Sequence, residues 1–175
     1  MAVLTEYSDA YTNSFITVPP VMNYPTEDGG ILMLKYFKHA FSATADVTSS
    51  VALCKLPAGR VRLILPLSWA YINWTTASQT LDLGWDAFTA MDGTTTAADA
   101  DGLVDGLDVD TVGFRNFVGN ATGALNTNFT TSGVETLGGT YLFESKSGVV
   151  IRATTQDTAG VSGDTIAGFL AYVQV

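Results

Sequence analysis

The stretch VALCKLPAGRVRLILPLSWAYINW, residues 51–74, carries the clearest secondary-structure pattern in this chain. In its second half, apolar side chains recur at every second position, which is the period of a β-strand with one buried face: Val61, Leu63, Leu65, Leu67, Trp69 and Tyr71. Pro57-Ala58-Gly59 is a strong turn signal, so we predict a β-hairpin between VALCKL and RVRLIL. Pro66 lacks a backbone donor, which indicates an edge position or a bulge.

Further strands are expected on both sides of this stretch. ILMLKYFKHAFSA (31–43) is compatible with a strand or a helix, and QTLDLGW (79–85) adds a short strand. Near the C-terminus, GGTYLFESK, GVVIRATT and TIAGFLAYVQV follow in quick succession, with a tight turn at Ser147-Gly148. Many short strands separated by turns are typical of an antiparallel β-sandwich or jelly roll. We therefore predict an all-β, jelly-roll-like sandwich over residues 31–175.

Three segments depart from this pattern. Residues 1–30 contain three prolines and several aromatic residues, which favours an extended N-terminal arm that docks on its own sandwich or on a neighbouring subunit. An ordinary first strand with a long loop is an equal alternative. ADADGLVDGL (98–107) allows one short helix, and residues 113–135 are expected to be loop with one brief strand.

The composition limits the classes of function. Hydrophobic residues make up 47% of the 175 residues, charged residues only 14%, and the net charge is −9, which suits one folded domain. An acidic chain is not expected to bind nucleic acid or an anionic membrane through its general field. The first residues do not resemble a signal peptide, and we expect the chain to be made and kept in a cytoplasm.

Nothing in the sequence predicts catalysis. The glycines of AGVSGDT (159–165) resemble a phosphate-binding loop, but Asp164 stands where lysine is required and a strand pattern follows. We predict that Gly160 and Gly163 have positive φ angles and shape a turn. His39 and Cys54 are the single histidine and cysteine, too few for a nucleophile–base arrangement with local support or for a zinc site. We expect neither an enzyme nor a bound cofactor.

Two clusters have possible binding chemistry. Against the calcium-loop template, Gly102 takes the sharp-turn position, and the ligand positions fall on Asp99, Asp101, Asp105 and Asp108. Ala97 at the first ligand position weakens the match, and a solvated acidic surface is the favoured alternative.

The second cluster is aromatic and suggests glycan stacking, with Trp69, Tyr71, Trp74 and Trp85 close in sequence. Trp69 and Tyr71 share the apolar face of their strand, so we expect them in the core.

VALCKLPAGRVRLILPLSWAYI and ESKSGVVIRATTQDTAGVSGDTIAGFLAYV resemble the small β-sandwich head proteins of tailed bacteriophages, the decoration or cement class. The resemblance covers about half of the chain. It implies no catalytic residues, a place on the capsid surface of a virion assembled in a bacterial cytoplasm, the major capsid protein as partner, and a homo-oligomer, with a trimer favoured. The alternative is an adhesion module of a tail or head fibre that binds host surface glycans.

Overall fold

The computed structural model describes residues 31–42, 49–75, 79–117, 139–157 and 160–175, so the expected arm (1–30) lies outside the described residues. Within those ranges the chain is all-β, as predicted. Its strands are β1 (Leu32–Ala40), β2 (Ser50–Leu56), β3 (Gly59–Asn73), β4 (Thr80–Trp85), β5 (Phe88–Thr89), β6 (Thr95–Thr96), β7 (Asp99–Asp108), β8 (Gly113–Asn116), β9 (Thr140–Ser145), β10 (Val149–Gln156) and β11 (Thr165–Gln174). No described helix has the length and apolar composition needed to cross a membrane.

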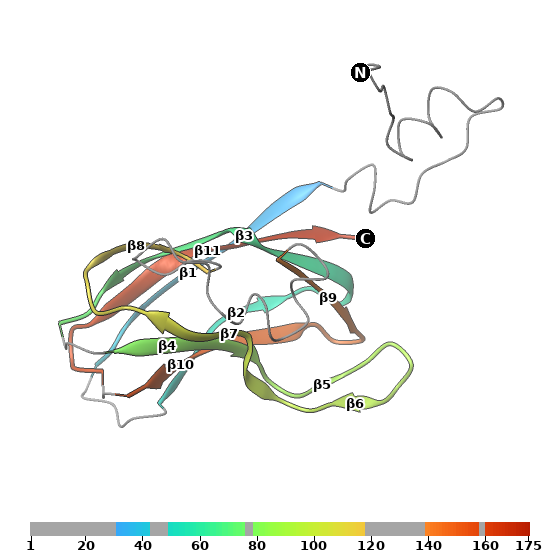
Figure 1. Ribbon diagram of the computed structural model, residues 1–175. Coiled ribbons are helices and arrows are strands. Elements are labelled where there is room, and N and C mark those ends of the chain that lie inside the picture. Colours follow the sequence, from blue (N-terminus) through green and yellow to red (C-terminus); the bar gives the residue numbers. More distant parts are fainter. Residues whose placement is uncertain (1–30, 43–48, 76–78, 118–138, 158–159) are drawn as a thin grey trace, which may run out of the picture.

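Two antiparallel sheets face each other (Figure 1). The first sheet has the order β1-β11-β3, and β8 and β9 share the far edge of β3; the second has the order β2-β10-β4-β7. Apart from β9 and the small β5–β6 hairpin, the described strands, renumbered in chain order, read 1-8-3-6 and 2-7-4-5. This is the order of a jelly roll, in which the chain alternates between the two sheets.

The predicted hairpin at Pro57-Ala58-Gly59 is wrong. The turn exists, and Gly59 has a φ of 103°, but β2 pairs with β10 whereas β3 pairs with β11, β8 and β9. The turn at Ser147-Gly148 likewise connects β9 in the first sheet to β10 in the second. In a jelly roll these turns are corners between the sheets, because the partner of each strand comes from a distant part of the chain.

Pro66 lies at a bulge, as its position indicated. The β3–β11 register passes from Ile64↔Ala171 directly to Trp69↔Phe169, so the four residues 65–68 oppose only Leu170. The buried Ser68 hydroxyl accepts a hydrogen bond from the Ala171 amide at 2.9 Å and donates one to the Ile64 carbonyl at 2.8 Å. It thus satisfies backbone groups that the bulge removes from the ladder.

The predicted helix over 98–107 is also wrong, because this stretch forms β7. Leu103, Val104 and Leu107 are buried, and their spacing imitates one face of a helix. That spacing arises from irregular pairing with β4, whose register shifts twice between Leu81 and Trp85. Because bulges displace the period-two pattern, a strand with bulges can carry a helix-like apolar spacing.

The core lies between the sheets, as the burial pattern of their facing side chains shows. Both sheets contribute, and the largest fully buried side chains are Trp74, Phe117, Phe143, Leu56, Leu63, Leu65, Ile72, Leu81, Leu83, Leu107, Ile151 and Ile166.

Asp164, in the turn before β11, is also buried; its carboxylate accepts hydrogen bonds from the Val161 and Thr75 amides. Gly163 has a φ of 96°, and the described residues 160–164 form a turn before β11. Gly160 was expected to have a positive φ as well, but it does not.

Candidate interaction surface

The outer face of the first sheet carries a row of five aromatic side chains, of which four are exposed and one, Phe169, is half-buried. β1, β11 and β3 pair in a register that aligns Tyr36 with Phe169 and Phe169 with Trp69. β3 and β8 align Tyr71 with Phe114. Paired residues of an antiparallel sheet point to the same side, so these five residues share one face. Tyr36 and Phe114 are each 72% exposed.

Trp69 and Tyr71 were expected in the core, and this expectation is wrong. They are 41% and 40% exposed, whereas Ala70 and Ile72 are buried. The bulge at residues 65–68 is the reason, because it shifts the alternation of β3 by one residue. Val61, Leu63 and Leu65 point inward before the bulge, and the aromatic residues after it point outward.

Between these rings lies a hollow of about 350 Å³, which we call the aromatic hollow. It is lined by Tyr36, Phe37, Lys38, Trp69, Ala70, Tyr71, Phe114, Ala167, Gly168 and Phe169. The Tyr71 and Phe114 rings meet edge to face with centroids 5.1 Å apart, and the Tyr36 and Phe169 rings lie 5.9 Å apart. Such contacts between rings hold the aromatic side chains that line the hollow in defined positions.

The floor of the hollow depends on a glycine. A Cβ on Gly168 would overlap the Trp69 carbonyl oxygen and would lie 2.7 Å from the Ala70 Cα and 3.0 Å from the Phe37 ring. Only glycine therefore lets β11 lie this close to β3 at this point.

The four predicted metal ligands all lie on β7, the edge strand of the second sheet. A side-chain hydrogen bond shared with Asp101 is the main cause that raises the pKa of Asp99, followed by burial and by the charge of Asp101. An Asp108 carboxylate oxygen accepts a hydrogen bond from the Asp110 amide. Among the described residues, no group of three or more acidic, histidine or cysteine side chains is arranged to hold a metal ion. The calcium site stays a prediction.

Asp82 of β4 is an acidic group that the sequence did not single out. It is buried, and its two oxygens accept hydrogen bonds from the Gly106 amide at 2.8 Å and the Gln156 side chain at 2.6 Å. Burial raises its pKa, and these two hydrogen bonds oppose the rise. Since both oxygens are engaged within the sheet, Asp82 ties β4 to β7 and β10.

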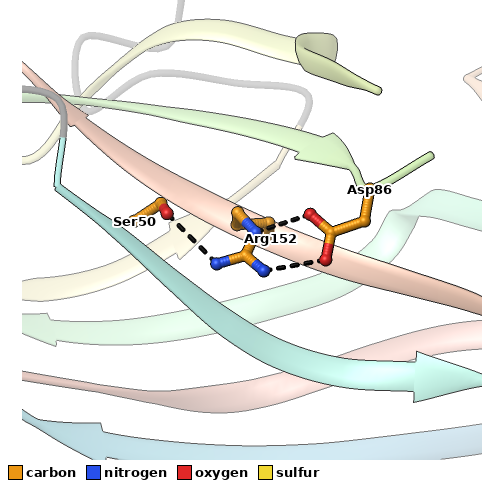
Figure 2. Close-up of polar contacts among 3 residues, drawn as sticks. All are labelled: Ser50, Asp86 and Arg152. Carbon is orange, nitrogen blue, oxygen red and sulfur yellow. Dashed lines mark hydrogen bonds and ion pairs between the residues drawn. The ribbon is translucent and has the colours of Figure 1, made fainter. Parts of the chain in front are cut away.

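A second polar group lies across β2, β10 and the end of β4 (Figure 2). Arg152 forms a bidentate ion pair with Asp86, with nitrogen–oxygen distances of 2.6 and 2.7 Å, and donates a further hydrogen bond to Ser50. The hydrogen bonds and charge of Arg152 lower the pKa of Asp86. Every charged group here has a partner, which suits a structural role.

His39 and Cys54 lie on strands, as expected, but in different sheets. The His39 ring packs edge to face on Phe41, with centroids 5.0 Å apart. Burial raises the pKa of the Cys54 thiol to about 11, which disfavours the nucleophilic thiolate. The described residues around His39 and Cys54 do not give either side chain the surroundings of a catalytic group.

No family model and no curated protein match this sequence. Solved structures share its fold. One chain in the capsid of Ralstonia phage GP4 superposes with a TM-score of 0.55 at 16% identity, over 95% of this chain and 96% of that one. A chain in the capsid asymmetric unit of cyanophage Pam1 superposes with a TM-score of 0.50 at 15% identity, over 84% of this chain and 87% of that one. The chain therefore has the β-sandwich fold of similarly sized chains in two bacteriophage capsids.

Proposed function

We propose that this chain is a non-enzymatic virion structural protein that binds and stabilises a bacteriophage capsid, as a decoration or cement protein. The observation that carries the proposal is the nearly end-to-end match with a chain of a phage capsid. This match covers 95% of this chain and 96% of the capsid chain, so it is not limited to one part of the fold.

The mechanism follows from binding to one state of the capsid. A protein that contacts the assembled shell, and not its dissociated subunits, shifts the equilibrium toward intact particles by mass action. The partner in this proposal is the major capsid protein, and the location is the outer surface of the virion. Contacts among copies that close as a ring, with a trimer favoured, would place one oligomer over several capsid subunits.

Co-sedimentation tests this proposal. The purified chain is mixed with capsids that lack it and, separately, with dissociated major capsid protein. We expect saturable binding to the capsids, little binding to the dissociated protein, and capsids that resist heat and denaturant better once bound. Equal binding to both forms, or no binding to capsids, would contradict the proposal.

A second candidate function, an adhesion module for host surface glycans, gains support from one observation. Trp69 and Tyr71 are on the surface, where rings can stack on sugars. However, the described lining of the aromatic hollow has no carboxylate or amide side chain to hold sugar hydroxyls, and this favours the first proposal. A glycan array with the purified chain separates the two, since only an adhesion module would give ring-dependent signals.

A further inference from the structure

The aromatic hollow is large and apolar for a surface that faces only water. Its walls include three large side chains, Tyr36, Trp69 and Phe114, that are each at least 41% exposed. Leu32 and Leu34 extend the apolar surface along β1 and are 50% and 40% exposed. A contiguous apolar patch of this kind marks a binding surface.

We propose that residues 18–25 of the same chain, VPPVMNYP, dock in the aromatic hollow. Proline-rich segments bind grooves lined with aromatic rings, because the extended proline backbone is preorganised and its rings pack flat on tryptophan and tyrosine. Pro19 and Pro20 supply this element, and Val18, Val21 and Tyr24 add apolar side chains.

The attachment point of the segment supports this occupant. Residues 1–30 join the sandwich at Ile31, directly before β1, and β1 is the edge strand that contributes Tyr36 to the hollow. From Leu32 to Tyr36 the strand advances roughly 14 Å. The ten residues between Pro20 and Ile31 can span about 30 Å when extended, which is enough to fold back over β1. The proposed docking needs the chain to reverse just before β1, and the sequence there is Gly29-Gly30, whose residues adopt reversed backbone conformations easily.

The charges of the two parts are complementary. Residues 1–30 contain four acidic side chains, Glu6, Asp9, Glu27 and Asp28, and no lysine or arginine. Lys38 lines the hollow. Opposite charges of this kind favour a defined orientation more than they add affinity.

The tether favours the chain's own segment over other occupants. A segment linked by a few residues is present at an effective concentration in the millimolar range. A neighbouring copy or a separate protein would have to compete with it, and a glycan would find few polar groups in the hollow. The segment thus covers the apolar face of its own sandwich.

Paramagnetic NMR on the full chain tests the proposal. A nitroxide is attached at residue 22 in the double variant M22C with Cys54→Ala, and the chain is enriched in ¹⁵N. We expect the amide signals of Lys38, Ala167 and Gly168 to lose most of their intensity relative to the reduced label, while those of the β5–β6 hairpin keep theirs.

Two controls make the test decisive. Trp69→Ala, and independently Phe114→Ser, should restore the lost intensity, whereas Met91→Ala, an exposed residue outside the hollow, should not. In a mixture of labelled unenriched chains with unlabelled enriched chains, no loss should occur. Loss in the mixture would mean that a neighbour's segment docks, and unchanged signals in the first sample would mean that the hollow is open; either result overturns the proposal. The isolated chain suffices, so the outcome is independent of capsid binding.

Discussion

Gly168 illustrates how a single residue type fixes a local geometry in this protein. Its missing Cβ allows β11 to approach the Trp69 carbonyl on β3. Gly168→Ala should therefore destabilise the fold by about 1–3 kcal/mol, the usual cost of forcing an extra carbon into a tight site. Chemical denaturation of the variant measures this directly.

Gly160→Ala is the matched control for this substitution. Among the described residues, a Cβ at Gly160 would meet only the Phe41 ring, at 3.6 Å or more, and this backbone is not left-handed. The control should be neutral or stabilising by about 0.4–1 kcal/mol, because alanine restricts the unfolded chain. If both variants lose the same stability, close strand approach is not what requires Gly168.

The ion pair between Asp86 and Arg152 makes a small, pH-dependent contribution to the free energy of unfolding. The two side chains are 36% and 32% exposed, so Arg152→Gln should cost only about 0.2–1 kcal/mol at neutral pH. Arg152 lowers the pKa of Asp86 in the folded state. The contribution is therefore present above the unfolded pKa of aspartate, about 3.9, and is lost as the pH falls through the lower folded value.

Urea denaturation of the parent protein and of Arg152→Gln between pH 2 and pH 7 checks whether this contribution is lost in acid. The gap in the free energy of unfolding should narrow below about pH 4. Arg60→Gln removes a pair whose side chains are 54% and 49% exposed, and it should change stability less. A gap that widens in acid would contradict the assigned role of Arg152.

At the scale of the element, the bulge of β3 decides which side chains reach the surface. Ser68→Ala removes the hydroxyl that accepts from the Ala171 amide and donates to the Ile64 carbonyl. Leaving buried backbone groups without partners costs about 1–3 kcal/mol, and we expect that loss in denaturant unfolding. Ser162→Ala, which removes an exposed hydrogen bond to the Ser42 carbonyl, should be near neutral. A neutral Ser68→Ala would show that the bulge does not depend on this hydroxyl.

The acidic strand β7 supports a prediction about calcium. Asp99 and Asp101 share a hydrogen bond, and this bond and the negative charge of Asp101 both raise the pKa of Asp99. A cation would reduce the repulsion between the two carboxylates. If these carboxylates bind calcium, the melting temperature should rise only at millimolar calcium, the range of low-affinity sites. Calcium at ten times its Kd would add about 1.4 kcal/mol. The quadruple Asp-to-Asn variant at 99, 101, 105 and 108 should lose the response; no rise in the parent would leave β7 a plain acidic surface.

For the molecule as a whole, the sequence predicts the strands better than their partners. The sequence predicts β3, β4, β10 and β11 because the alternation of apolar side chains that marks a strand lies within each segment. The sequence does not predict the partner of β2, because β10 lies about a hundred residues further along the chain. In addition, a turn that links the two sheets has the same sequence signals as a hairpin turn. The aromatic surface was missed because a bulge inverts the alternation of β3 before Trp69. The one signal for that inversion was Pro66, which indicates a bulge but not how many residues it contains.

Under the proposed function, this chain is an abundant component of a phage capsid. Quantitative mass spectrometry of purified virions of the phage that encodes it tests this claim most directly, by the molar ratio of the chain to the major capsid protein. We predict a copy number comparable to that of the major capsid protein, because a cement protein must occupy sites repeated over the whole shell. A few copies per particle, or none, would contradict the claim.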